Sequence, residues 1–121
     1  MLAPAGECWG KLNQIIPVQV QTIDDYCDKN SIGQIDILKI DTQGFDYEVL
    51  KGAERMLRDG RVRLIYTEII FSEMCRGIPR FDKVYAYLSD NQYKLVSFYQ
   101  QYYQNNRLSW TDALFMGPQS N

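Results

Sequence analysis

The stretch IDILKIDTQGFDYEVLKGA, residues Ile35–Ala53, decides the fold. Its first six residues are mostly β-branched or apolar and are bounded by turn residues, which predicts a largely buried strand over Ile35–Ile40. Apolar side chains then recur at helical spacing, which predicts one helix from Phe45 until Gly60 closes it. Gly44 lets the chain turn sharply between the two elements.

The flanking sequence continues the alternation of strands and helices. The patterns predict a short half-exposed strand or extended segment over Ile15–Gln21, a helix over Ile23–Lys29 with Thr22 as N-cap, a strand over Val62–Ile70, a loop over 71–80, a helix from Phe81 to Asp90, and strands over Tyr93–Tyr99 and Thr111–Gly117. Asn105–Asn106 marks a turn in a polar connection before the last strand. We therefore expect an α/β fold whose sheet is mostly parallel, with an antiparallel final strand and flanking helices.

Length, charge and composition exclude several classes of protein. The 121 residues suit one domain over 15–118, between an irregular leader (1–14) and a short tail (119–121). A net charge of −2 gives no general attraction to nucleic acid or to an anionic membrane. We see no apolar run that could span a bilayer and no signal peptide, so we expect a cytoplasmic protein.

Residue types also limit the chemistry that is available. The chain contains no histidine, and its three cysteines, Cys8, Cys27 and Cys75, are widely spaced. This excludes zinc sites built from Cys and His within the chain and Ser-His-Asp or Cys-His catalysis, and it argues against a disulfide framework. We expect each cysteine to be a small buried or half-buried apolar side chain, and any chemistry to use carboxylates, lysine, tyrosine or a cofactor.

Two carboxylates stand where strands of an open α/β sheet would end. Asp41 follows the first strong strand, and Glu68 comes near the end of the next, where ligands bind in such sheets. Other interpretations remain open: Asp41 could cap the helix or form the turn, Glu68 could pair with Lys39 or cap a helix, and Lys39 could be a solvated or ion-paired strand residue.

The run IDILKIDTQGFDYEVLKGAERML closely resembles the signature of the FkbM-type methyltransferases. The flanking VQVQTIDDY, LIYTEI, YKLVSF and DALFMG are similar to other parts of this family, so the resemblance covers residues 18 to 117. Two positions depart from the pattern: Gln43 stands where the family usually has Glu, and Asp46 where it often has Glu.

The resemblance implies an O-methyltransferase that transfers the methyl group of S-adenosylmethionine to a hydroxyl group of a sugar or natural product. It implies a class I, Rossmann-like methyltransferase sheet, of which this chain would be the second half. Asp41 and Glu68 would be the catalytic residues, and Lys39, Gln43 and Gly44 would bind substrate on the same rim. No metal is expected, and no strand–GxG–helix unit for the cofactor is found in the chain.

The same resemblance raises the question of what covers the rest of the sheet. Without the first half of the family's domain, Ile35–Ile40 would be an edge strand with unpaired backbone groups. We therefore expect a homodimer or a complementing half. The alternative to an enzyme is an inactive remnant or an interaction module that oligomerises through this edge. The tyrosine-rich run from Phe98 to Trp110 could stack on a sugar or simply cover the sheet.

Overall fold

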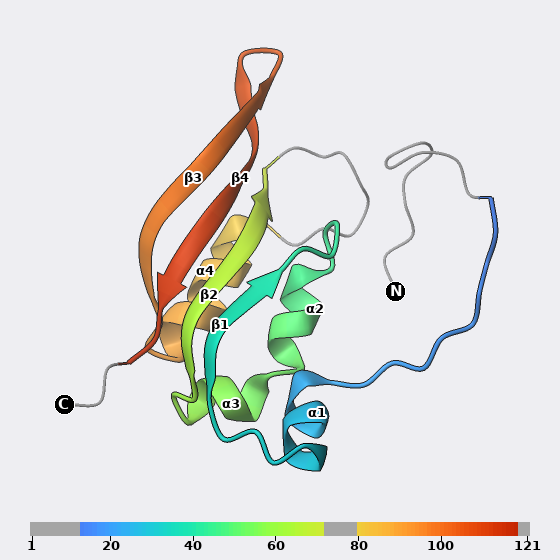
Figure 1. Cartoon of the computed structure of the whole chain (residues 1–121). Helices are drawn as coiled ribbons and strands as arrows, with labels where there is room; N and C mark the ends of the chain where they lie inside the picture. The colour runs from blue at the N-terminus through green and yellow to red at the C-terminus, as the bar shows by residue number, and fades with distance from the viewer. Residues whose placement is uncertain (1–12, 72–79, 119–121) are drawn as a thin grey trace.

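The structure, a computed structural model, describes residues 13–71 and 80–118 and has an α/β fold, as expected (Figure 1). The elements are α1 (Ile23–Lys29), β1 (Ile35–Ile40), α2 (Asp46–Lys51), α3 (Glu54–Arg58), β2 (Val62–Ile70), α4 (Phe81–Asp90), β3 (Lys94–Gln104) and β4 (Arg107–Met116). The predicted leader, the loop over 71–80 and the tail fall wholly or mostly outside the described residues. No helix in the described ranges has the length and hydrophobicity needed to cross a membrane.

The four strands form one mixed sheet in the order β1-β2-β4-β3. β1 and β2 are parallel, whereas β4 is antiparallel to both of its neighbours. β1, β2 and β3 therefore share one direction and the final strand is reversed. The expectation of a mostly parallel sheet is nonetheless wrong for the pairing, because β4 lies between β2 and β3 and leaves only one parallel pair. The last two strands, β3 and β4, are antiparallel neighbours.

The helix predicted from Phe45 to Gly60 is two helices, because α1 packs against its middle. α2 ends at Gly52, and α3 begins after Ala53. The break leaves the Gly52 carbonyl free to accept a hydrogen bond from the backbone N–H of Asp24 at 3.0 Å. Thr22 approaches closely as well, since a Cβ built at Gly52 would lie 3.3 Å from the Thr22 Cβ.

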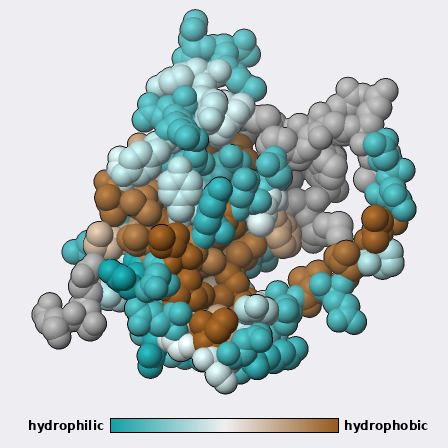
Figure 2. All heavy atoms as spheres, viewed as in Figure 1, coloured by the Kyte–Doolittle hydropathy of each residue, from teal (hydrophilic) through white to brown (hydrophobic). Residues whose placement is uncertain are grey.

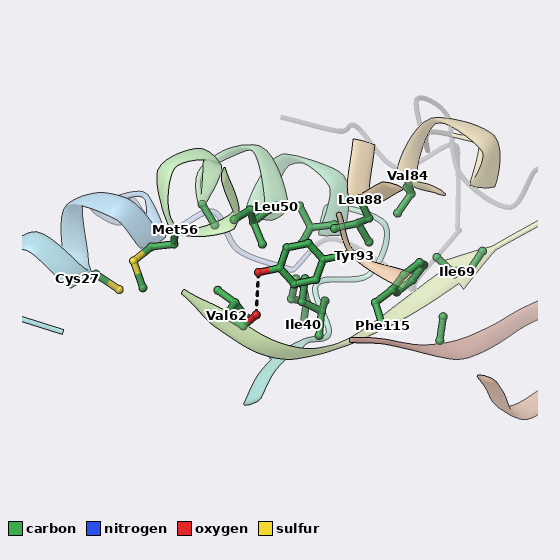
Figure 3. Close-up of a cluster of buried hydrophobic side chains, with 14 residues drawn as sticks. Cys27, Ile40, Leu50, Met56, Val62, Ile69, Val84, Leu88, Tyr93 and Phe115 are labelled. Carbon is green, nitrogen blue, oxygen red and sulfur yellow. Dashed lines mark hydrogen bonds between the residues drawn. The ribbon is translucent and has the colours of Figure 1, made fainter. Parts of the chain in front are cut away.

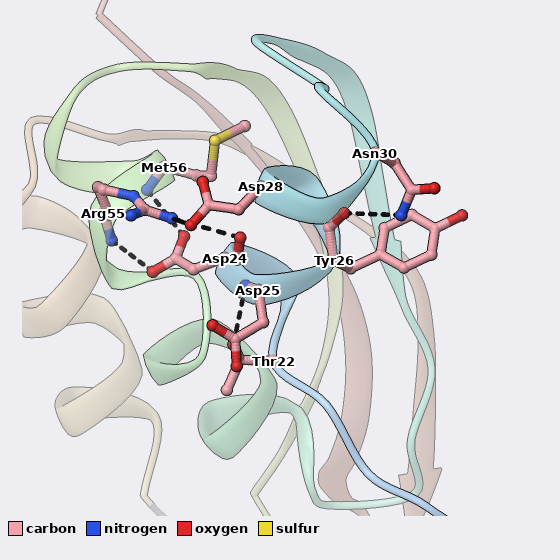
Figure 4. Close-up of polar contacts among 8 residues, drawn as sticks. All are labelled: Thr22, Asp24, Asp25, Tyr26, Asp28, Asn30, Arg55 and Met56. Carbon is pink, nitrogen blue, oxygen red and sulfur yellow. Dashed lines mark hydrogen bonds and ion pairs between the residues drawn. The ribbon is translucent and has the colours of Figure 1, made fainter.

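Asp24 also caps α3 from a distance of some thirty residues in the chain. Its carboxylate accepts hydrogen bonds from the backbone N–H groups of Arg55 at 2.8 Å and Met56 at 3.1 Å (Figure 4). The Arg55 guanidinium lies 2.7 Å from the carboxylate of Asp28. Thr22 is the N-cap of α1, as predicted, and accepts from the backbone of Asp25 at 3.1 Å. The TIDD sequence therefore fixes α1 against α3.

Of the two alternatives predicted for Ile15–Gln21, a short half-exposed strand or an extended segment, the strand does not form. Residues 13–22 belong to no helix or strand, and Val18 and Val20 are 75% and 86% exposed. Their alternation indicates an extended conformation, but no described strand pairs with this segment.

β3 and β4 are longer than predicted and form a hairpin that contains the tyrosine-rich connection. The expected turn at Asn105–Asn106 is present, and both residues have positive φ, 51° and 60°. This is the combination that two-residue type I′ hairpin turns require. The run that was expected to be a polar connection is thus paired as strand up to the turn.

The hydrophobic core lies between one face of the sheet and the helices (Figure 3). It includes Cys27, Ile40, Leu50, Met56, Leu57, Val62, Ile65, Ile69, Val84, Leu88, Tyr93, Ala113 and Phe115. The hydroxyl of Tyr93 donates to the carbonyl of Val62 at 2.7 Å, which satisfies the polar end of this ring inside the core. Side chains alternate along a strand, so the intervening residues of β2 and β4, such as Tyr66 and Trp110, lie on the opposite face, here called the open face.

Candidate functional site

The parallel pairing of β1 and β2 brings the two predicted carboxylates together. Ile40 is paired with Thr67, and the residues that follow are Asp41 and Glu68. Two parallel strands end at the same edge of the sheet, which is where open α/β sheets bind ligands. The sequence-based prediction of a shared acidic rim therefore agrees with the register.

A cavity of about 310 Å³ opens at this end of the sheet. Its lining includes three of the five predicted site residues, namely Lys39, Asp41 and Glu68. The remainder of the lining is Ile40, Tyr66, Gln100, Tyr102, Trp110 and Asp112. The cavity is therefore built from β1, β2 and the long hairpin, and it combines carboxylates with aromatic rings.

Gln43 and Gly44 lie in the turn after β1 rather than in the lining of this cavity. Both have positive φ, 56° for Gln43 and 95° for Gly44. Such a φ is easy for glycine and costly for other residues, so Gly44 makes the turn into α2 as predicted. Gly44 borders a neighbouring cavity of about 20 Å³, which Asp46 and Glu68 also line.

Asp46 holds this turn against β2 and was not among the predicted site residues. It is 6% exposed, and its carboxylate accepts hydrogen bonds from the hydroxyl of Thr67 at 2.6 Å and the backbone N–H of Glu68 at 3.1 Å. It also accepts from the backbone N–H of Thr42 at 3.0 Å and from the Thr42 hydroxyl. In the sequence, its signal was its place in the run that resembles the family signature, which does not reveal the contact with β2.

Asp41 does not cap α2, whereas Lys39 is a solvated residue of β1, which is one of the two alternatives left open for it. The N-cap of α2 is Phe45 and receives no side-chain cap bond, while the Asp41 carboxylate forms no hydrogen bond or ion pair with any described residue. Lys39 is exposed and makes no ion pair within residues 13–71 and 80–118. Both side chains are therefore available to a ligand in the cavity.

Glu68 has the most perturbed carboxyl group of the site. Burial and then the negative charges of Asp41, Asp46 and Asp112 raise its pKa from 4.5 to about 7. Its carboxylate accepts no hydrogen bond from the described residues, so no hydrogen bond from this part of the chain offsets the cost of its charge. Its pKa thus lies well above that of an ordinary carboxyl group and near neutral pH, which suits a group that accepts and releases protons.

Aromatic side chains from β2, β3 and β4 form one wall of the cavity. Tyr102 and Trp110 are paired across the hairpin and stack at a centroid distance of 4.9 Å and an angle of 21°. The Tyr66 hydroxyl donates to the carboxylate of Asp112 at 3.0 Å. Burial, followed by the hydrogen bond and charge of Asp112, raises the pKa of Tyr66. Tyr102 and Trp110 belong to the tyrosine-rich run for which stacking was one predicted role, but their meeting with Tyr66 depends on the pairing of strands and could not be predicted.

The raised pKa of Glu68 has a consequence for stability. Between pH 4.5 and about 7 the folded chain binds the proton more tightly than the unfolded chain, so stability falls as the pH rises through this window. Glu68→Gln cannot ionise. We expect this variant to match the wild type near pH 4.5 and to exceed it at pH 8 by about 1–2 kcal/mol, after allowance for solvent screening.

Urea unfolding at the two pH values measures this difference. Glu48→Gln is the matched control, because Glu48 is exposed and forms a surface ion pair with Lys51 at 2.8 Å. We expect the control to change stability by less than about 0.5 kcal/mol at either pH. Equal stability of wild type and Glu68→Gln at pH 8 would mean that the Glu68 carboxylate is not destabilised in the folded chain.

Comparison with known proteins identifies the class to which this fold and site belong. A family model described as the methyltransferase FkbM domain matches residues 4–95, and the chain belongs to this family. The protein is therefore a member of a methyltransferase family, as the signature run indicated.

One curated relative gives a more particular likeness. The chain is 30% identical over 69 residues to 2-O-methyltransferase NoeI of Sinorhizobium fredii (strain NGR234). The matched residues make up 57% of this chain and 28% of NoeI, so the chain spans little more than a quarter of that relative's length. No solved structure matches the chain significantly.

Proposed function

We propose that the chain forms the acceptor side of an S-adenosylmethionine-dependent O-methyltransferase. The observation that carries this proposal is Glu68, a carboxyl group with a pKa near 7 in a cavity beside Asp41 and an aromatic wall. The family membership and the name of the relative NoeI, a 2-O-methyltransferase, support transfer of a methyl group to oxygen. The parallel β1–β2 pair and the reversed final strand support a Rossmann-like, class I sheet.

Different residues of the cavity would orient the acceptor hydroxyl group and remove its proton. Transfer of a methyl group to a hydroxyl requires that the oxygen be oriented and lose its proton. Glu68 would accept that proton, because its ionised form is present at neutral pH and is held without compensating partners. Asp41 would accept a hydrogen bond from the same or a neighbouring hydroxyl and so orient it. Lys39 would hold polar oxygens at the rim.

S-adenosylmethionine would supply an electrophilic methyl group when bound. The side chains that line the cavity suit the sulfonium group of this molecule, because carboxylates and aromatic faces attract a cation. The described residues do not fit its nucleotide, because no strand–GxG–helix unit occurs among them. We therefore propose that the residues that hold the nucleotide lie outside the described part of the chain or in another polypeptide.

The acceptor class we propose is a sugar or a natural product that presents several hydroxyl groups. The stacked Tyr102 and Trp110 give a flat apolar surface, on which the apolar face of such a ring can pack. Asp112 and Glu68 supply acceptors for hydroxyl groups beside that surface. This combination favours a polar ring with one apolar face over a purely apolar substrate.

A second candidate function is an interaction module without activity. It is favoured by β1, which is the edge of the sheet among the described residues and carries the 65% exposed Ile37. Titration of the chain with S-adenosylmethionine by calorimetry separates the candidates. The absence of binding by a folded, oligomeric chain would favour the module.

The enzyme proposal is tested by methyl transfer from labelled S-adenosylmethionine to a panel of glycosides, comparing wild type with Asp41→Ala and Glu68→Gln. We expect each substitution to reduce transfer at least 100-fold, because general acid–base groups contribute about 10²- to 10⁴-fold. Asp36→Ala, an exposed carboxylate earlier on β1, is the control and should retain the wild-type rate. Undiminished transfer by Asp41→Ala would remove Asp41 from the catalytic residues.

A further inference from the structure

β3 contains a β-bulge at the level of the cavity. Between its paired residues Tyr99 and Tyr102, β3 has two residues, Gln100 and Gln101, whereas β4 has only Thr111 in the corresponding place. Gln100 lies in the left-handed region, with a φ of 51°. An extra residue whose first bulged position is left-handed is the G1 type of bulge, in which that position is usually glycine. Gln100 therefore holds a backbone conformation that glycine would adopt more easily.

A buried hydrogen bond holds this bulge. The hydroxyl of Thr111, which is fully buried, donates to the carbonyl of Tyr99 at 2.8 Å. The bond gives a partner to a backbone group beside the place where the strand pairing is interrupted. Strained backbone conformations persist where the surrounding structure fixes them, and they are frequent at functional sites. We therefore asked what the side chain of Gln100 contributes to the cavity.

The amide of Gln100 is available to a ligand. Its side chain is exposed and lines the cavity of about 310 Å³ together with Glu68 and Asp112. Within residues 13–71 and 80–118 this amide forms no hydrogen bond. Ionised carboxylates can only accept hydrogen bonds, and the hydroxyl of Tyr66 already donates to Asp112. Gln100 thus adds a neutral group that can both donate to a hydroxyl group and accept from it.

We propose that Gln100 binds the hydroxyl group next to the one that is methylated, so that the site selects acceptor rings with two adjacent hydroxyl groups. This inference rests on the proposed function. The reacting oxygen takes the methyl group while its proton passes to Glu68. The adjacent hydroxyl donates to Asp112 and accepts a hydrogen bond from the amide of Gln100.

The order of these residues across the sheet favours this arrangement. Glu68 on β2 is paired with Asp112 on β4, and Asp112 is paired in turn with Tyr99, the residue before Gln100 on β3. Neighbouring strands lie about 5 Å apart. The proton acceptor and the amide therefore stand on either side of Asp112, so one ring seated between them can contact all three groups.

The surface around the bulge suits a polar ring. Figure 1 shows the β3–β4 hairpin projecting beyond the ends of β1 and β2. Figure 2 shows hydrophilic and intermediate side chains, in teal and pale colours, at this end, whereas hydrophobic side chains in brown lie nearer the middle of the molecule. The stacked pair of Tyr102 and Trp110 supplies the apolar contact. A ring with one apolar face and hydroxyl groups at its edge matches both features.

Gln100→Gly separates the side chain from its effect on the backbone. Glycine removes the amide and adopts the left-handed conformation without strain. We therefore expect this variant to unfold at a urea concentration at least as high as the wild type. Gln101→Ala is the matched control, because Gln101 is the neighbouring exposed amide and is not among the residues that line the cavity.

Binding is tested with methyl hexopyranosides, each compared with its monodeoxy analogues, in ¹H–¹⁵N NMR titrations of the chain. We expect the side-chain amide resonance of Gln100, assigned by its absence in Gln100→Gly, to shift with a glycoside that binds. The dissociation constant should rise about 10-fold in Gln100→Gly, the effect of one neutral hydrogen bond, and stay unchanged in Gln101→Ala. The analogue without the contacted hydroxyl should bind the wild type about 10-fold more weakly than its parent glycoside, and should bind Gln100→Gly as well as that parent does.

The outcomes distinguish this inference from the proposed function. A glycoside that binds the wild type and Gln100→Gly equally would overturn the role of Gln100 and leave a sugar acceptor in place. If no glycoside of the panel bound the wild type, both the acceptor class and the role of Gln100 would be contradicted. Equal losses of affinity in Gln100→Gly and Gln101→Ala would also overturn the inference, because the effect would then belong to the hairpin as a whole.

Discussion

Replacing Asp46 with alanine should lower the free energy of unfolding by about 3 kcal/mol. The substitution removes a buried acceptor from the hydroxyl of Thr67 and from the backbone N–H groups of Thr42 and Glu68. Each buried donor that loses its partner costs roughly 1–3 kcal/mol, and some of the loss is recovered if water enters. Urea unfolding at pH 7 with circular dichroism detection measures the change.

Asp36→Ala is the control for this prediction, because it removes a carboxylate of the same length from an exposed position next to Arg63. An exposed pair of this kind is worth at most about 1 kcal/mol. If Asp46→Ala were no more destabilising than Asp36→Ala, the hydrogen bonds that join the turn after β1 to β2 would not hold the site together.

Gly117→Ala is the other substitution with a large expected effect. A Cβ at this position would lie 2.5 Å from the carbonyl oxygen of Val62 and 2.6 Å from the Cε1 atom of Tyr93. Both neighbours are buried, and the Tyr93 ring is also held by its hydrogen bond to Val62. The backbone must therefore move, and we expect a loss of about 3 kcal/mol, at the upper end of the usual cost of overpacking.

Gly33→Ala provides a glycine control, since a Cβ there meets no heavy atom within 4 Å. We expect it to be neutral or to stabilise the chain by up to about 1 kcal/mol through the unfolded state. Thermal and urea unfolding of the two variants side by side give the comparison. Similar stabilities for both variants would show that the end of β4 does not pack against Tyr93 as described.

Sequence patterns were sufficient to predict the elements that depend on residues close together in the chain. The bounds of α1 follow from its N-cap Thr22, and β1 and β2 follow from runs of β-branched residues. The break at Gly52 could not be predicted, because it depends on a hydrogen bond from Asp24 in another helix. For Ile15–Gln21 a strand and an extended segment could not be distinguished, because alternation indicates an extended backbone and says nothing about whether a neighbouring strand exists.

The same distinction applies to the candidate site. Asp41 and Glu68 could be found from the sequence, because each follows directly from the position of a strand end. The aromatic wall of Tyr66, Tyr102 and Trp110 could not, because it needs the order of the strands and the register of the hairpin. Asp46 was missed for a related reason, since its partner Thr67 lies on the next strand.

The proposed role of Glu68 as acceptor of a hydroxyl proton depends on a pKa raised toward neutral pH. Titration of the carboxyl carbons by ¹³C NMR, with Glu68→Gln to assign the resonance, measures this directly on the chain. We expect an apparent pKa of about 7 for Glu68. An ordinary value near 4.5 would contradict the account, because Glu68 would then be a solvated carboxylate without the basicity that the proposed transfer needs.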